Sequence, residues 1–262
     1  MKNVIANYHT HTYRCGHASG KDEEYIEAAI SSGLEILGFS DHTPMIFPTG
    51  HVSDFRVPPE LAKDYFDSLT ALKSKYADKI EIHIGVEAEY YPAMFDDYYK
   101  YIMSFPCEYL ILGQHFILRE EDGRRSFAKT DDEQTLSDFF DNLIMAVDTG
   151  KFLYIAHPDV INFTGSDEVF IRHARRFLEH AAVSGIPLEI NRLGLEDGRH
   201  YPRRIFWEEC AKTGNPVIIG IDAHQPGPLA DSAMVARCVD YARSLGLNLV
   251  KDNRLVIPSP KL

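Results

Sequence analysis

The sequence lacks any close pair of cysteines, although it contains four of them. Cys15, Cys107, Cys210 and Cys238 are widely separated, and none belongs to a CxxC motif. Structural zinc sites are usually built from several thiolates, and disulfide frameworks use clustered cysteines in short secreted chains. The pattern argues against both and is typical of free thiols in a reducing compartment.

Long hydrophobic runs are missing as well. No run approaches the ~20 apolar residues that are needed to cross a bilayer. The N-terminal stretch MKNVIANYHTHTYR has no apolar segment of the kind found in a signal peptide. The expectation is a soluble protein of the cytoplasm with no membrane partner.

Basic charge is scarce. The chain has 27 Lys and Arg against 39 Asp and Glu, which gives a formal net charge of −12 at pH 7. Non-specific binding to nucleic acid or to anionic membranes depends on basic surface, so the charge disfavours both partners. A small anionic substrate remains compatible with this charge if bound metal ions reverse its sign locally.

What the chain does contain is a regular alternation of two patterns. Short apolar runs typical of buried strands lie at residues 4–8, 35–39, 80–86, 109–113, 152–156, 187–190 and 217–221. Amphipathic segments of helical length lie at residues 22–32, 60–76, 93–104, 133–149, 167–184, 202–213 and 229–245. Seven such units predict an α/β fold with a parallel sheet, either open or closed into a barrel.

The organisation of the chain predicts one domain over residues 1–262. No low-complexity linker divides the sequence, and an α/β barrel often fills this length alone. Two connections are long: residues 43–59, with four prolines, and residues 116–132, which are rich in charge. Long loops in a compact domain usually bind ligands or move, and whether either one acts as a lid stays open.

Each predicted strand ends at or just before a His, Asp, Glu or Asn. These residues are His9, His11, Asp41, His42, Glu87, His115, His157, Asn191, Asp222 and His224. The carboxyl ends of barrel strands form one rim, so these side chains are predicted to meet. Residues two apart in an extended segment point the same way, which allows His9 and His11 to bind one ion.

Glycines stand two residues before three of these candidates. Gly85, Gly113 and Gly220 precede Glu87, His115 and Asp222 at positions of the same strand parity. A missing side chain below each candidate leaves room for a wide polar cluster at the barrel mouth, although glycine in a strand also marks bulges.

Imidazole and carboxylate without thiolate form the ligand set of catalytic zinc, manganese or iron. An isolated HxH or DAH motif is mostly chance, but independent accidents would not all fall at strand ends. The set is too large for one ion. Two or three ions with open positions suit phosphoryl transfer, because closely spaced metals activate water and clamp the reacting oxygens.

Five further histidines are not assigned as ligands: His51, His83, His173, His180 and His200. His83 shares its parity with Glu87 and is expected deeper in the lumen, as a hydrogen-bonded core residue partnered by Glu189. His51 and His200 lie in loops near the mouth, where a substrate contact is possible.

Seven short motifs contain the strand-end residues and the residues around them. They are HTHTYRCGH at 9–17, SDH at 40–42, GVEAEYYP at 85–92, GQHFI at 113–117, AHPD at 156–159, EIN at 189–191 and IDAH at 221–224. In order and spacing the chain resembles the PHP (polymerase and histidinol phosphatase) superfamily, and specifically its monofunctional histidinol-phosphatase branch. The resemblance covers nearly the whole chain.

This resemblance implies a distorted TIM-like barrel of seven β–α units with a centre of two to three divalent ions, whether zinc, manganese or iron. Carried over residue by residue, one ion takes His9, His11, Glu87 and Asp222; the second shares Glu87 and adds His115 and His157; the third takes His17, His42 and His224. His17 is added here by the resemblance, since it lies in a loop.

The resemblance further implies hydrolysis of a small phosphate monoester by a metal-bridging hydroxide. L-histidinol phosphate, in histidine biosynthesis, is the leading substrate. Asp222, Glu87 and His224 are taken as the catalytic residues, with Asp222 handling the proton of the nucleophile. The general acid for the leaving group is not assigned, and neither is the oligomeric state.

Positive and polar side chains should complete the substrate site. Arg192, Arg199 and Arg56 are candidates for charge-assisted contacts with phosphate, and Asn191 and Gln114 are further candidates. The family often has a small hydroxyl residue in place of Gln114, Thr or Ser in place of Arg192, and a basic residue soon after AHPD that is missing here.

Three alternatives remain open at this point. The chain can be a PHP phosphoesterase for another small phosphate, a nucleotide or a nucleic-acid 3′ end. It can be an amidohydrolase-like metal hydrolase, since fold alone does not fix chemistry. A non-enzymatic metal-storage or binding role is the least favoured, because the ligand set is complete and open.

Overall fold

The computed structural model of the chain describes residues 4–257. Within this range one parallel sheet has eight strands in sequential order. The strands are β1 (Ala6–Asn7), β2 (Ile36–His42), β3 (Glu81–Ala88), β4 (Tyr109–Leu112), β5 (Tyr154–Ile155), β6 (Leu188–Asn191), β7 (Pro216–Gly220) and β8 (Asn248–Leu249). All seven predicted strands are present, and β8 is an addition that the sequence patterns did not predict.

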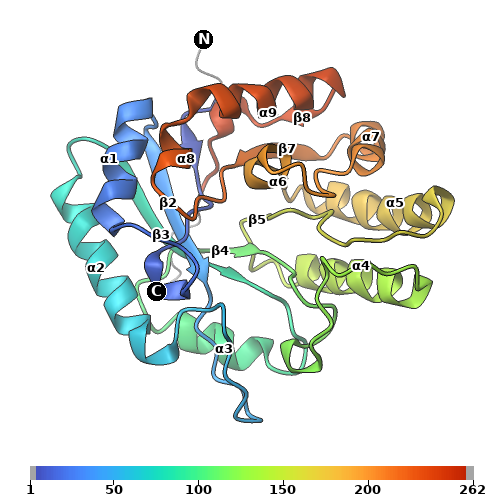
Figure 1. The fold of residues 1–262 in the computed structure, drawn as a ribbon, viewed down its shortest axis with the longest axis horizontal. Coiled ribbons are helices and arrows are strands. Elements are labelled where there is room, and N and C mark those ends of the chain that lie inside the picture. Colours follow the sequence, from blue (N-terminus) through green and yellow to red (C-terminus); the bar gives the residue numbers. More distant parts are fainter. Residues whose placement is uncertain (1–3, 258–262) are drawn as a thin grey trace.

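Helices surround this sheet on the outside (Figure 1). The longer ones are α1 (Asp22–Ser32), α2 (Ala62–Lys75), α3 (Phe95–Ile102), α4 (Glu133–Asp148), α5 (Asp167–Ser184), α7 (Arg204–Thr213) and α9 (Ser232–Ser244). Two short helices, α6 (Arg192–Glu196) and α8 (Gly227–Ala230), lie in loops, and single 3₁₀ turns occupy η1 (Tyr13–Cys15), η2 (Pro59–Leu61), η3 (Glu120–Asp122) and η4 (Lys251–Asn253).

Capping signals explain why some helix boundaries follow directly from the sequence. Helix α5 begins after Ser166, whose hydroxyl accepts the N–H of Val169, and it ends at Gly185 with a left-handed φ of 71°. The predicted helix 229–245 is instead divided into two. Asp231 interrupts it and caps α9 by accepting the N–H of Met234.

The two ends of the sheet meet at its carboxyl edge. A parallel bridge joins Thr10, after β1, to Ala223, after β7. The N–H of His11 donates to the Ala223 carbonyl at 2.9 Å, and the N–H of Ala223 donates to the His9 carbonyl at 3.3 Å. This bridge closes the sheet around a lumen, and the predicted distorted (β/α)7 TIM-like barrel is confirmed, with β8 added at its amino end.

Asparagine side chains fill the seam below this bridge, where β1 and β7 diverge. Asn7 Oδ1 accepts the N–H of Ile221 at 2.9 Å. Asn253 Oδ1 accepts the N–H of Ile219 at 2.8 Å, while Asn253 Nδ2 donates to the carbonyls of Ile219 and Ala6 at 2.8 and 2.9 Å. Two amide side chains thereby replace ladder hydrogen bonds that buried backbone groups would otherwise lack.

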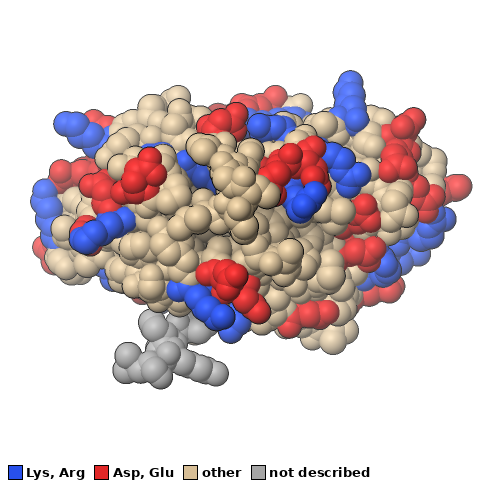
Figure 2. Space-filling model, turned by 90° about the horizontal axis from the view of Figure 1, so that it is seen from below, with Lys and Arg blue, Asp and Glu red and all other residues tan. Residues whose placement is uncertain are grey.

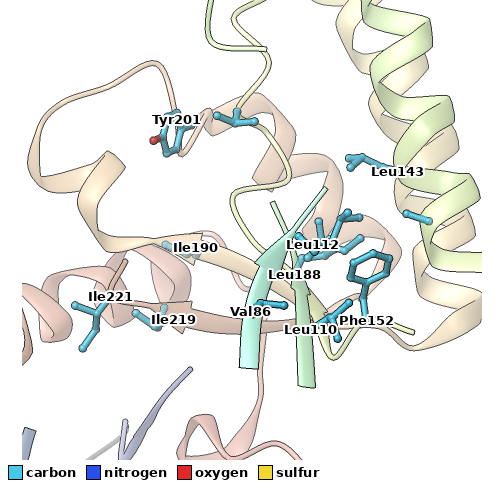
Figure 3. Close-up of a cluster of buried hydrophobic side chains, with 14 of the residues drawn as sticks. Val86, Leu110, Leu112, Leu143, Phe152, Leu188, Ile190, Tyr201, Ile219 and Ile221 are labelled. Carbon is cyan, nitrogen blue, oxygen red and sulfur yellow. The ribbon is translucent and has the colours of Figure 1, made fainter. Parts of the chain in front are cut away.

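Alternation along the strands separates two hydrophobic clusters. Ile111 belongs to a small cluster inside the lumen, whereas its neighbours Leu110 and Leu112 belong to the large cluster between sheet and helices. Figure 3 shows Leu110 and Leu112 with Val86, Leu143 and Phe152 in this outer layer. The lumen is therefore apolar in its lower part, and polar side chains are left for its carboxyl end.

The four cysteines are buried and unbridged, and no helix within residues 4–257 has both the length and the apolar character to span a bilayer. Figure 2 shows acidic and basic side chains interspersed on one face of the molecule, so this face offers no continuous basic stripe for nucleic acid. The predicted domain limits include residues 1–3 and 258–262, which lie outside the described residues.

Candidate metal centre

All nine candidate ligands meet at the carboxyl end of the barrel. Eight of them line a cavity of about 750 Å³, and His9 lies buried next to them. The eight are His11, His17, His42, Glu87, His115, His157, Asp222 and His224. The prediction that strand ends and the first loop bring these side chains together is therefore realised in the fold.

The innermost group contains two histidines and two carboxylates. His9 Nε2 lies 3.6 Å from Glu87 Oε1 and 3.4 Å from Asp222 Oδ1. His11 Nε2 lies 3.6 Å from Glu87 Oε2 and 3.2 Å from Asp222 Oδ1. His9, His11 and Asp222 each offer one ligand atom within 4.8 Å of the others, and the Glu87 carboxylate borders the same space.

Glu87 also faces a second set of imidazoles. Its Oε1 lies 3.0 Å from His157 Nε2 and 3.6 Å from His115 Nε2, and its Oε2 lies 3.0 Å from His42 Nδ1. Both carboxylate oxygens therefore have histidines from different strands around them. A carboxylate in this position can bridge two ions.

The third set lies nearest to the solvent. His17 Nε2 and His224 Nε2 are 3.1 Å apart, and the ring of His42 lies 5.2 Å from that of His17 between centroids. His17 is exposed and comes from the loop after β1, whereas His42 ends β2. Three imidazole rings from distant segments thereby face one region at the rim.

Buried atoms without partners test whether these residues fit metal ions. Six such atoms within the described chain belong to the candidate ligands: His9 Nε2, His11 Nε2, His42 Nδ1, Glu87 Oε2, His157 Nδ1 and Asp222 Oδ1. A buried polar atom without a hydrogen bond costs about 1–3 kcal/mol, so six of them in one cluster need a common explanation. Divalent cations bound at the cluster offer that explanation, and the ligand set fits them.

The surroundings of Glu87, His42 and His224 favour the protonation states that bind metal. Burial opposes ionisation of Glu87, but His115, His42 and His9 outweigh it and hold the pKa of this carboxyl well below its usual value. Burial likewise lowers the pKa of His42 well below its ordinary value, and burial together with His11 lowers the pKa of His224 to about 3. Ionised carboxylates and neutral imidazoles are the protonation states that coordinate ions.

The pKa of His9 shifts in the opposite direction, as do those of His11, His17 and His157. Burial lowers the pKa of His9, yet the carboxylates of Glu189, Asp222 and Glu87 raise the pKa well above the ordinary value. These three groups favour a positive charge at this point, whether it is carried by a proton or by a metal ion.

A second carboxylate lies behind three of the imidazoles. The contacts are His9 Nδ1 to Glu189 at 2.8 Å, His11 Nδ1 to Asp41 at 3.3 Å and His115 Nδ1 to Glu89 at 3.0 Å. Such contacts fix the tautomer and leave Nε2 free to bind the metal. This role of the outer carboxylates was not predicted from the sequence, although Glu89 shares the strand parity of Glu87.

Two of the candidate ligands have strained backbones. His157 has a φ of 31° and Asp222 a φ of 55°, and neither is a glycine. Such conformations cost on the order of 1–3 kcal/mol and persist where the surroundings enforce them, often at functional sites. Here they occur directly after β5 and β7, where the chain turns at the cluster.

Two glycines leave the room that was predicted for the cluster. A Cβ on Gly113 would lie 1.8 Å from Glu87 Oε1, and a Cβ on Gly220 would lie 2.0 Å from Glu189 Oε2. Gly85 differs, because the space beside it is filled by Tyr109 and not by a polar ligand.

Comparison with known families adds to this geometry. Residues 7–193 match the model of the PHP domain. The chain belongs to the PHP domain family. Its relatives include the probable histidinol-phosphatase of Deinococcus radiodurans, 29% identical over 232 residues, which cover 85% of this chain and 87% of the relative.

Further relatives extend the comparison. The probable histidinol-phosphatase of Schizosaccharomyces pombe is 26% identical, with 83% of this chain and 80% of that one covered. Among solved structures, the histidinol phosphate phosphatase of Lactococcus lactis, in complex with zinc, L-histidinol and phosphate, superposes with a TM-score of 0.73 at 19% identity over 97% of this chain and 99% of that one. The family resemblance seen in the motifs is thereby confirmed, and the barrel is that of known PHP structures.

The candidate arginines of this PHP domain have different surroundings. Arg199 lines the cavity, and its Nη1 donates to the hydroxyl of Tyr201 at 2.9 Å. Arg56 is buried between Glu89 and Glu120, and its Nε donates to Glu120 at 2.7 Å. It is not among the residues that line the cavity.

Arg192 is also buried, and it forms ion pairs with two carboxylates that are 41% and 42% exposed. Its Nη1 donates to Glu196 at 2.6 Å and its Nη2 to Asp231 at 3.2 Å, so it joins α6 to the start of α9. Like Arg56, it does not line the cavity. Among the three predicted arginines of the PHP domain, Arg199 is the one that faces the cavity.

The two polar candidates support neighbouring backbone and side chains. Gln114 accepts the N–H of Tyr90 at 3.0 Å and donates to the Phe116 carbonyl at 2.7 Å. Asn191 Nδ2 donates to Glu189 and Asp222 at 2.8 and 3.0 Å. Asn191 thus holds the carboxylate of a candidate ligand in place.

His83 is hydrogen-bonded and lies outside the metal cluster, as predicted, but the prediction that Glu189 is its partner deeper in the lumen was wrong. Its Nδ1 lies 2.7 Å from Glu108 and its Nε2 lies 2.9 Å from Glu81, and the side chain is only partly buried. His83 lies near the amino end of β3, whereas Glu189 lies beside Gly220 at the carboxyl end of the barrel. The expected partner is therefore too far along the lumen and contacts His9 instead.

Both long loops of the PHP domain contribute to the cavity. Asp54 and Phe55 come from residues 43–59, and Arg125 and Phe127 come from residues 116–132. None of these four residues was predicted to line the site, because a charged or aromatic residue in a loop does not by itself indicate a cavity. His200, for which a substrate contact was considered, also lines the cavity.

Proposed function

We propose that this PHP domain is a metal-dependent phosphatase that hydrolyses L-histidinol phosphate to L-histidinol and phosphate. The single observation that carries the chemistry is the set of unpartnered buried ligand atoms around Glu87 and Asp222. The substrate is supported by the relatives from D. radiodurans and S. pombe. Both are probable histidinol-phosphatases, and both align with more than four fifths of this chain.

The nine ligands are proposed to hold two to three divalent ions. His9, His11, Glu87 and Asp222 form the first set; Glu87 with His115 and His157 forms the second; and His17, His42 and His224 form the third. Zinc, manganese and iron all suit nitrogen and oxygen ligands. Zinc is the first ion to test, because the L. lactis phosphatase was solved with it.

When bound, the ions would supply neutralisation of the phosphoryl oxygens and activation of the attacking water. The carboxylate of Asp222 is the proposed acceptor for the proton of this water, because Asn191 holds its Oδ2 while its Oδ1 faces the cluster. Glu87 keeps the two inner sets of histidines together, and His224 orients the substrate from the rim. Arg199 is proposed to contact the phosphate from the cavity wall by a charge-assisted hydrogen bond.

Metal analysis of the purified full chain, followed by phosphate-release assays, tests this function. We expect bound divalent metal and faster hydrolysis of L-histidinol phosphate than of phosphotyrosine or a nucleoside monophosphate. A metal-loaded protein that releases phosphate from none of them would refute the proposal.

A matched pair of variants separates the cluster from other histidines. His115→Ala is expected to lose metal and activity together, since it removes one ligand of the second set. His173→Ala is the control, because His173 lies on α5 and contacts Glu133 away from the cavity. Activity of His115→Ala equal to that of the wild type would exclude the proposed ligand set.

A further inference from the structure

Asp54 and Arg125, from two different loops, place opposite charges next to each other in the cavity wall. Asp54 lies in the loop 43–59 and Arg125 in the loop 116–132, and both line the cavity. Asp54 Oδ1 lies 3.6 Å from Arg125 Nη2, and the two side chains are 81% and 39% exposed. Among the cavity-lining residues that the structure describes, Asp54 is the one carboxylate besides the candidate ligands Glu87 and Asp222.

The contact between them is weak enough to be exchanged. A distance of 3.6 Å is longer than a charge-assisted hydrogen bond, which spans about 2.7–2.9 Å. An exposed ion pair of this kind contributes about 0–1 kcal/mol. The carboxylate of Asp54 therefore retains capacity for a shorter contact with a cation that enters the cavity.

Arg125 has other contacts that hold it in place. Its guanidinium carbon lies 5.1 Å from the ring centroid of Phe116 and 5.5 Å from that of Phe127. Cation–π contacts at these distances fix the direction of the guanidinium. Arg125 thereby presents a fixed positive charge next to Asp54 without forming a tight pair with it.

The pair is not needed to join the two loops. Glu120, in the loop 116–132, already accepts a hydrogen bond from Arg56 Nε at 2.7 Å and lies 3.1 Å from His51 Nε2. Thr49 donates to Glu121 at 2.8 Å. Because these contacts connect the loops, a purely structural role for Asp54 and Arg125 would be redundant.

The chemistry of the proposed substrate matches this arrangement. Its phosphate belongs at the metal cluster, and the remainder carries an ammonium group and an imidazole. The cavity volume of about 750 Å³ exceeds what a phosphate alone would fill, and Phe55 and Phe127 provide aromatic surface beside Asp54 and Arg125. For an ammonium group that follows the phosphate into the cavity, Asp54 is the lining carboxylate that is not itself a candidate metal ligand.

We propose that Asp54 binds the ammonium group of the substrate and that Arg125 is the residue that positions Asp54. The site thereby selects phosphate monoesters of amino alcohols over phosphate monoesters without an amine. This inference rests on the proposed phosphatase function and deepens it, because it names the substrate class that the cavity accepts.

A pair of substrates that differ only in the amine tests the inference. The metal-loaded full chain is assayed with L-histidinol phosphate and with 3-(imidazol-4-yl)propyl phosphate, which lacks the amino group. We expect kcat/KM to favour the amine by about two- to fivefold, the size of an exposed charge pair. In Asp54→Asn this preference should fall to near one, through a higher KM for L-histidinol phosphate, with kinetics on the other ester unchanged.

Two further variants sharpen the test. Arg125→Gln should lower the preference partly and raise KM with kcat unchanged, because it releases Asp54 without removing it. Asp122→Asn is the matched control: Asp122 lies in the same loop, pairs with Arg119 and does not line the cavity, so the preference should stay as in the wild type.

The measured rates distinguish a failure of the proposed role of Asp54 from a failure of the phosphatase function. An equal loss on both esters in Asp54→Asn, or an unchanged preference, would overturn the role of Asp54 while leaving the phosphatase function intact. Equal rates of the wild type on the two esters would do the same. A wild type that hydrolyses neither ester would overturn the proposed function itself, and this inference with it.

Discussion

The Nδ1 atom of His9 lies 2.8 Å from a carboxylate oxygen of Glu189, and both side chains are fully buried. This contact leaves Nε2 of His9 directed at Glu87 and Asp222. Gly220 makes it possible, because any side chain there would occupy the space of the Glu189 carboxylate. The candidate metal centre thus has an outer layer of carboxylates that orients the imidazoles of the inner layer.

Replacement of Glu189 should weaken metal binding without removing a ligand. In Glu189→Gln the amide cannot stabilise His9 as a carboxylate does, so we expect zinc affinity to fall by about 10- to 100-fold. Competition with a chromophoric chelator measures this affinity. Glu179→Gln, on the exposed side of α5, should bind zinc like the wild type, and equal affinity in both variants would contradict the role of Glu189.

The lumen glycine at 113 provides a steric test. A Cβ in Gly113→Ala would lie 1.8 Å from Glu87 Oε1, so Glu87 must move away from its histidines. We expect metal content to fall and activity to drop by about 100-fold or more, as small displacements in a catalytic site can cause. Gly227→Ala is the control, since a Cβ there meets nothing within 4 Å. Full metal content in Gly113→Ala would contradict the expected displacement of Glu87 from its histidines.

Arg56 should matter for stability. Arg56→Met would leave Glu89 and Glu120 buried without their cation, and breaking such a pair costs about 3–5 kcal/mol. Chemical denaturation measures the loss in the free energy of unfolding. The exposed Arg119→Met should change it by less than about 1 kcal/mol. A stable Arg56→Met variant with a raised KM would instead favour a direct contact with substrate.

The ionisation of Glu120 should make the free energy of unfolding depend on pH. Burial raises its pKa, but Arg56, Ser53 and His51 outweigh burial and hold the pKa of Glu120 below its ordinary value. A carboxyl with a lowered folded-state pKa stabilises the protein fully above its unfolded pKa of about 4.3, and this contribution is lost as pH falls through the folded value. The difference in unfolding free energy between wild type and Glu120→Gln should therefore be constant at pH 6–8 and shrink below about pH 4. A difference that persists unchanged at pH 3 would contradict this.

Arg199 provides the test of the cavity wall. It faces the cavity, and we expect Arg199→Gln to raise KM or to lower kcat/KM for L-histidinol phosphate by about 10- to 100-fold, with metal content unchanged. Arg192→Gln serves as the comparison, because its ion pairs with Glu196 and Asp231 predict a loss of stability first. Wild-type kinetics in Arg199→Gln would remove this residue from the phosphate site.

The sequence contained the parts of this site that depend on local pattern. Alternating strands and helices set the order of the sheet, and cap residues such as Ser166 and Gly185 set helix boundaries to the residue. Because parallel strands place their carboxyl ends on one rim, the position of a His or Glu at a strand end was enough to predict that it meets the others. His9, His11 and Glu87 needed no further information.

The tertiary structure decided everything that depends on which side chain pairs with which. Glu189 contacts His9 and not His83, and Arg56 and Arg192 lie in ion pairs and not in the cavity. Apart from the i,i+4 pair of Arg192 with Glu196, these pairings join residues far apart in the chain, so the local sequence carries no signal of the partner. The sequence by itself determined the ring of candidate ligands, whereas only the folded chain determined the carboxylates behind it and the charges at its mouth.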